Sequence, residues 1–384
     1  MPATSQKEES GFSKATKGAI LFKVIFRRLH LLLALIGGIL LINLSVSGAL
    51  LIYAKDIQRL INPHYWLVNI EENNSIEPLA LSVLVEKIAL LHSEKIHLIE
   101  QGEQPNHVWQ VRLTNKQYLN LNPYTGDIVL RHSFYDTFYG FVMAWHRWLL
   151  YSNDQGERPF QLWVSIASLL FIIELIIGLT LWLKPKYPIK RLRVRWQAKN
   201  KIRFHQLHLF LGAVCAIPLI LIAFSGMAFF WQDATKAIVE AVTVNEITSR
   251  SAPPSLNVIE DTIASHNLDM AYKQASNALS LGQVYRIYMP QKLNLPLALR
   301  IKMPDETHAY SWSWSNPYTG ENLHHFDASK QNIATKVWQF KYKFHIGDFL
   351  GWPVSVLWLI LSLLPSFFVI SGLYLAWQRH KQKR

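Results

Sequence analysis

Residues 122–127 read Asn-Pro-Tyr-Thr-Gly-Asp, and residues 316–321 read Asn-Pro-Tyr-Thr-Gly-Glu. Outward from these two stretches, other short sequences recur in the same order in both halves of the 384-residue chain. They are Leu-His-Leu (29–31 and 207–209), Ser-Gly (47–48 and 225–226) and Gly-Leu (178–179 and 372–373). Because the order is kept, the sequence indicates a duplication of one structural unit.

The composition favours a membrane protein, since 50% of the residues are apolar. Four stretches are long and apolar enough to cross about 30 Å of hydrocarbon, and the only formal charge inside them is Glu174. The predicted spans are 29–53, 162–183, 204–231 and 354–377. The first is too long to be the apolar region of a cleaved signal peptide.

The net charge of +13 is concentrated in three short segments. Lys and Arg accumulate in residues 1–28, 184–203 and 378–384, whereas the long segments between the spans are near neutral. By the positive-inside rule, these three segments face the cytoplasm. The excess of basic residues therefore indicates membrane topology and contact with anionic lipid rather than nucleic-acid binding. The single cysteine, Cys215, excludes an intramolecular disulfide.

Each half also predicts a small folded region on the non-cytoplasmic side. Helical apolar spacing at 79–91, and a weaker copy at 256–265, precedes runs of alternating polarity that end at the Thr-Gly turns. The predicted strands are 97–100, 108–114 and 118–122 in the first half, and 284–290, 297–303 and 310–315 in the second. We therefore predict two small α+β domains, at 54–136 and 232–335, followed by interfacial segments at 137–161 and 336–353.

The fold class predicted is thus an α-helical membrane protein with four transmembrane helices in a parallel internal repeat, carrying two small α+β domains. Since both halves begin in the cytoplasm, a pseudo-twofold axis should run along the membrane normal.

Strands closing on an Asn-Pro-Tyr-Thr-Gly turn, flanked by a span with Leu-His at its start and Ser-Gly near its end, resemble the PepSY-associated transmembrane family of bacterial inner-membrane proteins. The resemblance extends from about residue 27 to residue 379. Members include iron-regulated ferric-siderophore reductases that bind b-type haem and have the same two-copy plan. The resemblance implies two PepSY-like periplasmic domains, an oxidoreductase activity and an inner-membrane location with both termini cytoplasmic.

Four histidines occupy repeat-related positions near the ends of the membrane elements. His30 and His208 lie at the cytoplasmic ends of the first and third spans, and His146 and His345 lie on the helices before the second and fourth. Haem iron with two axial imidazoles requires two histidines on opposing elements. We therefore expect two haem b groups, one between His30 and His208 and one between His146 and His345. The alternative is that these histidines only anchor helix ends at the lipid headgroups.

Other polar residues have more than one interpretation. His205, three residues before His208, is interpreted either as a replacement for it as ligand or as a contact of a haem propionate. Glu174 lies in the middle of a span, where it serves proton uptake or contacts a quinol, or is a protonated carboxyl bonded to a neighbouring helix through Asn43 or Ser45. His380 belongs to the basic tail, and two further histidines, His324 and His325, are expected at the surface.

The chain contains no dinucleotide-binding motif, because its paired glycines at 37–38 lie inside a span. Electrons must then come from a quinol or a separate cytoplasmic reductase. The function expected is a haem-dependent reductase that delivers electrons to a periplasmic ferric siderophore or other Fe(III) chelate. Two alternatives stay open: a non-enzymatic membrane protein that binds or senses a periplasmic partner, and an iron or siderophore permease.

Overall fold

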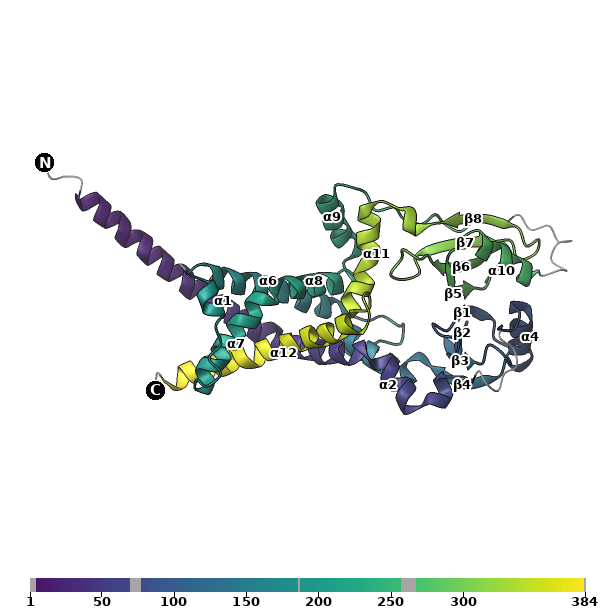
Figure 1. The fold of residues 1–384 in the computed structure, drawn as a ribbon, viewed down its shortest axis with the longest axis horizontal. Helices are drawn as coiled ribbons and strands as arrows, with labels where there is room; N and C mark the ends of the chain where they lie inside the picture. Colours follow the sequence, from purple (N-terminus) through teal and green to yellow (C-terminus); the bar gives the residue numbers. More distant parts are fainter. Residues whose placement is uncertain (1–4, 70–76, 186, 257–266, 383–384) are drawn as a thin grey trace. The chain divides into compact units, whose positions relative to one another are not determined.

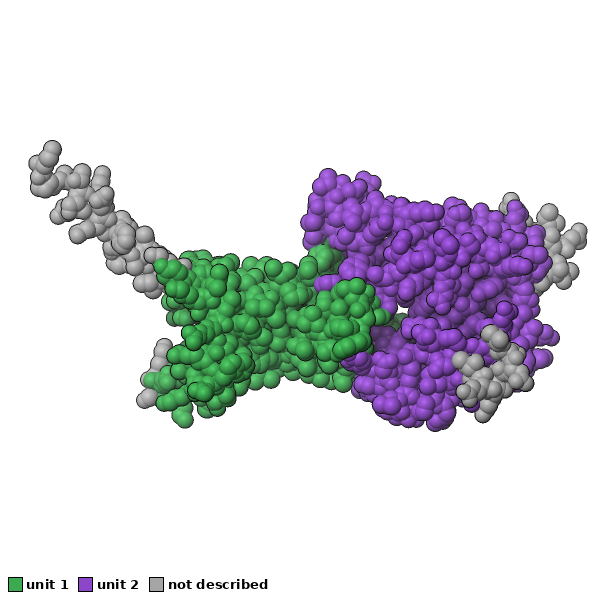
Figure 2. Space-filling view, in the orientation of Figure 1, with its two compact units in different colours: residues 1–52, 145–235, 345–384 green, residues 53–144, 236–344 purple. Residues whose placement is uncertain are grey.

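The structure, a computed structural model, describes residues 5–69, 77–185, 187–256 and 267–382. The chain forms two compact units (Figures 1 and 2). Unit 1 contains residues 1–52, 145–235 and 345–384, and unit 2 contains residues 53–144 and 236–344. Each half of the sequence therefore contributes to both units.

Unit 1 is built from apolar helices, whose bounds are α1 Ser5–Ile52, α6 Phe160–Leu183, α7 Asn200–Val214, α8 Ala216–Met227 and α12 Trp352–Lys381. In the described part of the chain, three segments are each long and apolar enough to cross a membrane: Leu21–Ile52 within α1, α6 and α12. The α7 and α8 helices pass this test only together, as one bent span, which would make four.

The third predicted span, 204–231, is not a single straight helix. It breaks at Cys215, and α7 and α8 differ in direction by 65°. Pro218 explains the position of the break, because a proline ring clashes with the carbonyl four residues earlier, here that of Val214. A proline inside this span predicts a kink, and the bend of 65° confirms it.

The α12 helix, in contrast, continues without a break through Pro365. Ser45 of α1 inserts its hydroxyl beside this proline: Oγ donates to the carbonyl of Ser362 at 2.5 Å and accepts from the backbone N–H of Ser366 at 3.3 Å. A side chain inserted in this way replaces a helical hydrogen bond. It also ties α1 to α12.

These contacts correct the expectation that Asn43 or Ser45 would be the partner of Glu174. Asn43 donates to the carbonyl of Ile39 at 2.9 Å, and its Oδ1 accepts from Trp145 Nε1 at 3.2 Å. Both side chains are therefore bonded to other groups.

Unit 2 contains one antiparallel sheet of eight strands, in the order β4-β3-β2-β1-β5-β6-β7-β8. The bounds are β1 Ile96–Glu100, β2 Trp109–Leu113, β3 Gln117–Leu121, β4 Ile128–Ser133, β5 Gln283–Tyr288, β6 Leu297–Lys302, β7 Ser311–Ser315 and β8 Asn322–Phe326. The sequence led us to expect two separate small domains. Instead β1 pairs with β5, Ile99 opposite Ile287, so strands of both halves share one sheet.

The core of unit 2 lies between this sheet and two helices, α4 Leu81–Leu91 and α10 Leu268–Asn277. Leu84 and Ile88 of α4 are almost fully buried against the strands. On α10 the buried residues are Ala271 and Ala275, whose small side chains allow the helix to pack closely.

The two Asn-Pro-Tyr-Thr-Gly stretches form turns with matching hydrogen bonds. The Oδ1 atom of Asn122 accepts from Tyr124 N at 3.0 Å, and Asn316 Oδ1 accepts from Tyr318 N at 2.9 Å. Each turn ends at a glycine with positive φ, which is 79° at Gly126 and 81° at Gly320. Glycine adopts this left-handed conformation without steric cost.

The strands predicted before these turns are confirmed, but the chain continues into a further strand after each of them, β4 and β8. The predicted helix at 256–265 lies outside the described residues except for its first residue. The remaining short elements are α2 Ala54–Ile61, α3 Pro63–Trp66, η1 Phe134–Asp136, α5 Phe138–Trp148, η2 Ile189–Leu192, α9 Gln232–Thr243, η4 Ala328–Lys330 and α11 Ile333–Ile346.

Candidate functional site

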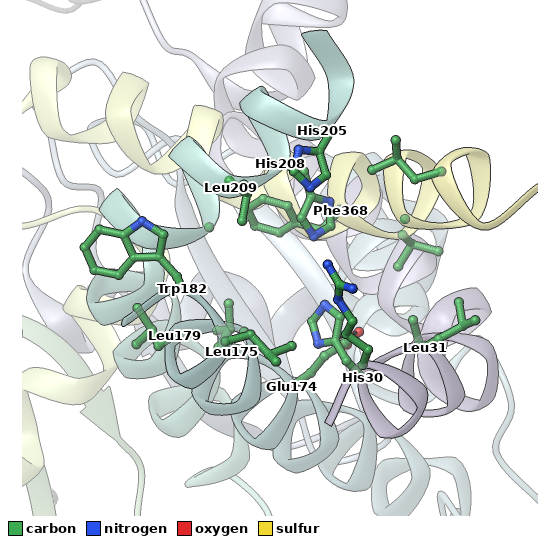
Figure 3. A pocket seen from close by; sticks show the side chains of 18 of the residues that line it. His30, Leu31, Glu174, Leu175, Leu179, Trp182, His205, His208, Leu209 and Phe368 are labelled. Atoms are coloured by element: carbon green, nitrogen blue, oxygen red, sulfur yellow. Dashed lines mark ion pairs between the residues drawn. The ribbon is translucent and has the colours of Figure 1, made fainter. Parts of the chain in front are cut away.

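His30 and His208 face one another within unit 1. His30 extends from α1 and His208 from α7 into the same pocket (Figure 3), and their ring centroids are 6.2 Å apart with the planes at 86°. Each ring lies near a glycine of another helix: a Cβ built on Gly178 of α6 would be 3.6 Å from His30 Cε1, and one on Gly372 of α12 would be 3.8 Å from His208 Cε1. The absence of a side chain at these two glycines therefore leaves room for the imidazole rings.

His146 and His345 form a second pair in the same unit. Their ring centroids are also 6.2 Å apart, with the planes at 48°. The glycines of the two Ser-Gly pairs lie closer to these rings, since a Cβ built on Gly48 would be 3.2 Å from His146 Cε1 and one on Gly226 only 2.8 Å from His345 Cε1. Substituents larger than hydrogen would displace both rings.

Serine hydroxyls engage the Nδ1 atoms of three of these four histidines. Ser47 Oγ lies 3.0 Å from His146 Nδ1, and Ser225 Oγ lies 3.1 Å from His345 Nδ1. For the third, the distance from Ser371 Oγ to Nδ1 of His208 is 2.8 Å. A partner on Nδ1 fixes the ring orientation and leaves Nε2 as the nitrogen available to a metal.

This role of serine was missed in the sequence. Each of the three serines directly precedes the glycine that lies against the same imidazole, so the Ser-Gly pair provides both a hydrogen bond and space. The pair was visible as a marker of the repeat. Its function was not, because the histidines it contacts are distant in sequence.

His30 differs from the other three. Its neighbouring glycine is preceded by Ile177 instead of serine, and its Nδ1 is buried without a hydrogen-bond partner among the described residues. The nearest carboxylate oxygen is Glu174 Oε1 at 3.9 Å, an ion-pair distance. In the second half the equivalent position is Phe368, whose ring lies 5.3 Å from that of His208. The first pair is thus chemically asymmetric.

The pocket around the first pair is a cavity of about 190 Å³. A cavity needs only about 10–15 Å³ on this measure to hold one water, so the space suits a much larger ligand. Glu174 and His205 also line it. His205 therefore reaches the site as predicted, but the ring paired with His30 is that of His208.

A family model described as the PepSY-associated TM region matches residues 27–379. The chain belongs to this family. No curated protein matches the sequence. As a PepSY-associated TM region protein, the chain is a membrane protein, in agreement with its long apolar helices.

The three histidines that the sequence assigned to the surface and to the basic tail of this PepSY-associated protein lie apart from the two pairs. His324 and His325 are exposed on β8, where the ring of His324 stacks on Trp314 at 5.7 Å. The third, His380, is exposed in the last turn of α12.

The geometry of both pairs fits a metal bound between two imidazoles. In the described part of the PepSY-associated chain, no group of three or more His, Cys, Asp or Glu side chains is arranged to hold a metal ion. Two imidazole nitrogens, each about 2 Å from a shared metal, place their ring centres about 6 Å apart. Both pairs have 6.2 Å. Two axial imidazoles and no further protein ligand is one of the arrangements that hold haem iron.

Proposed function

We propose that this PepSY-associated protein is a di-haem electron-transfer protein that reduces a ferric chelate, such as a ferric siderophore, and thereby releases Fe(II). The observation that carries the proposal is the recurrence of one geometry: two histidine pairs, each from two different helices and each with ring centroids 6.2 Å apart. A headgroup anchor does not require such pairing.

His30 and His208 would hold one haem b, and His146 and His345 the other. Haem supplies reversible one-electron transfer when it is bound. The chain orients three of the four imidazoles through serine hydroxyls at Nδ1. No acid–base catalysis by the protein is required.

The two pairs lie at different levels of unit 1. Gly48, which contacts His146, follows His30 by eighteen residues on the same helix α1. At 1.5 Å per residue this is about 27 Å, close to the thickness of the hydrocarbon core. Two haems at these levels would carry an electron across most of a membrane.

The direction of transfer follows from the charge distribution. We infer a bacterial inner membrane with both termini and the 184–203 linker in the cytoplasm, where the basic residues are. A quinol or a cytoplasmic reductase would be the one-electron donor on the side of His30, and Fe(III) in a chelate outside would be the acceptor on the side of His146; haem held by the two pairs would connect them. Fe(II) binds anionic oxygen ligands less strongly than Fe(III), so reduction releases the metal.

The proposal is tested by purifying the full chain after expression with added haem. We expect Soret and α-band absorption with two haems per chain. His30→Ala and His208→Ala should each lose the same haem, and His146→Ala and His345→Ala the other, whereas His325→Ala, at an exposed position on β8, should keep both. A wild-type protein without these bands would refute electron transfer by haem and favour a non-enzymatic binding protein. Loss of different haems by His30→Ala and His208→Ala would refute the pairing.

A further inference from the structure

Four cationic side chains and one histidine gather along one end of the cavity that contains His30 and His208. They come from four separate elements: Lys23 and Arg27 from α1, Arg191 from η2, His205 from α7 and Arg379 from α12. We call this set the basic rim. Its members converge on one cavity from distant parts of the sequence, so it differs from a single run of charge at a helix end.

The basic rim lies to one side of the two imidazoles. Arg27 precedes His30 by three residues, which is about 4.5 Å along α1, and Arg379 follows Gly372 by seven residues, about 10 Å along α12. Arg191 is held at the same end by its Nη1, which donates to the carbonyls of Leu181 and Trp182 at 3.5 and 3.4 Å. These guanidinium groups are within a few helical turns of the iron position inferred above.

At this end the cavity offers hydrogen-bond donors but almost no hydrogen-bond acceptor. Among the described residues that line it, the one carboxylate is that of Glu174, one helical turn before Gly178 and next to His30. None of the salt bridges within the described ranges involves Lys23, Arg27 or Arg379. In addition, the Nε1 of Trp182, which lines the cavity, is buried without a hydrogen-bond partner in the described chain. An acceptor-rich anion would complement this end.

We propose that the basic rim is a carboxylate-binding site that takes the propionate groups of the porphyrin held between His30 and His208. This inference rests on the proposed haem binding. Guanidinium groups bind carboxylates through parallel hydrogen bonds, and burying a carboxylate without such a partner costs several kcal/mol.

The site fixes which way the porphyrin faces. The carboxylate edge lies at the end of the cavity formed by the basic segments, and the apolar edge lies among residues such as Leu41, Phe171 and Leu175. The side of the protein that would receive electrons therefore carries the propionate edge of the porphyrin. His205, one turn before His208 and the repeat counterpart of Arg27, belongs to this edge as a propionate partner and not as an iron ligand.

The experiment compares haem with haem dimethyl ester, in which both propionates are uncharged. Each porphyrin is titrated, by its Soret band, into the haem-free full chain carrying His146→Ala, so that His30 and His208 form the one complete pair. The chain is placed in nanodiscs of neutral lipid, and the added substitutions are Arg27→Gln, Arg379→Gln and the double variant. Arg195→Gln is the matched control, because Arg195 is an exposed residue of the basic linker that does not line the cavity.

We expect haem to bind at least about tenfold more tightly than the ester, since each charge-assisted hydrogen bond contributes on that order. Each substitution in the rim should reduce this preference severalfold, and the double variant should nearly abolish it without weakening ester binding. The control should keep it. Equal binding of haem and ester, or an unchanged preference in the double variant, would overturn the inference while leaving haem binding intact.

Two further arms separate the remaining explanations. If His208→Ala does not reduce porphyrin binding, or if neither porphyrin binds at all, the proposed function itself fails.

The phosphate of an anionic lipid has the same chemistry as a propionate. If the preference for haem persists in the double variant and only the enrichment of phosphatidylglycerol that copurifies with the protein from mixed-lipid nanodiscs falls, the rim binds lipid and the inference is wrong.

Discussion

Each of the four paired histidines lies against a glycine of another helix, and the closest approach is at Gly226. A Cβ there would lie 2.8 Å from His345 Cε1, which is inside van der Waals contact. Gly226→Ala should therefore displace the imidazole and cost about 1–3 kcal/mol of stability, typical of overpacking. Absorption spectra and thermal unfolding should show loss of the haem at His146 and His345, with the other haem retained.

The matched control is Gly37→Ala. Its new Cβ would meet only Leu41 and Leu170, at the ordinary distances of 3.8 and 3.9 Å. Alanine is also favoured over glycine within a helix by about 1 kcal/mol. We therefore expect unchanged spectra and equal or higher stability. If both substitutions had the same effect, the close approach at Gly226 would not be the cause.

A second residue-scale prediction concerns His308 in unit 2. Its ring packs against Tyr285, Tyr342 and Tyr310 with centroid distances of 4.9, 5.2 and 5.6 Å. Burial, reinforced by Arg300 and other nearby cations, lowers the pKa of His308 to about 3. The unfolded chain, with an ordinary histidine pKa near 6.5, then binds this proton at a higher pH than the folded chain does.

The contribution of His308 to stability is thus complete above about pH 6.5 and is lost progressively as the pH falls towards 3. Thermal unfolding of the purified protein should show lower stability at pH 5 than at pH 7. In His308→Phe, which keeps a ring at this position, the loss between these pH values should shrink by about 1–2 kcal/mol. An equal pH dependence in both proteins would contradict this assignment.

The sequence was sufficient to select the four histidines, because duplication marks equivalent positions. It did not reveal how they are held. The hydroxyl of Ser371 is 163 residues from His208 in sequence, and no local pattern connects the two. The absence of such a serine next to His30 could be read from Ile177, but its meaning required the contacts of the fold.

At the scale of elements, the two halves of the chain are joined by the pairing of β1 with β5. Across this junction Arg286 contacts Glu100 Oε2, with its Nη2 at 2.5 Å and its Nε at 2.7 Å. Tyr285 donates its hydroxyl to the other carboxylate oxygen at 3.1 Å. Since the side chains of Glu100 and Arg286 are only 18% and 28% exposed, the ion pair is largely shielded from water.

Glu100→Gln would leave the guanidinium of Arg286 without its carboxylate at the junction of the strands. We expect a loss of about 1–3 kcal/mol, between the values for exposed and fully buried pairs. Hydrogen exchange of the β1 and β5 amides should accelerate most. Glu103→Gln is the control, because the Lys55–Glu103 pair is long, 4.0 Å, and about half exposed, so its loss should cost less than 1 kcal/mol. Equal effects would show that the junction does not depend on this pair.

Alternating polarity predicted the six strands before the turns, and the turns themselves followed from Asn and Gly at fixed positions. The common sheet was not predictable in this way, because the pairing of Ile99 with Ile287 joins residues of different halves. A proline inside an apolar run predicts a kink, which the third span has at Pro218. It does not predict whether the helix breaks there or continues, as α12 does through Pro365 beside Ser45. Tertiary contacts decide between these outcomes.

Across the whole molecule, the duplication supplies two sites, and the differences between the halves make them unequal. Both rings of the His146–His345 pair have a serine at Nδ1, whereas in the other pair only His208 has one and His30 has Glu174 nearby. A nearby carboxylate stabilises the oxidised state of a bound metal, so the two proposed haems should differ in reduction potential. Glu174→Gln should raise the potential of the haem proposed at His30 and leave that of the haem proposed at His146 unchanged in a spectroelectrochemical titration. A shift of both potentials, or of neither, would contradict this.

The last prediction concerns transfer between the two levels. If the pairs act in series, losing either one must stop transfer across the membrane, although the remaining haem can still be reduced directly. Proteoliposomes with a trapped reductant inside, and a ferric chelate with an impermeant Fe(II) indicator outside, measure this. Wild-type protein should produce external Fe(II), and His208→Ala and His345→Ala should each reduce the rate at least about tenfold, since the gap of about 27 Å along α1 then has a single haem. In His208→Ala, dithionite added outside should still reduce the haem proposed between His146 and His345. If one variant kept the wild-type rate, the pair it lacks would lie outside the route, and the duplication would not be serving as a two-step conduit.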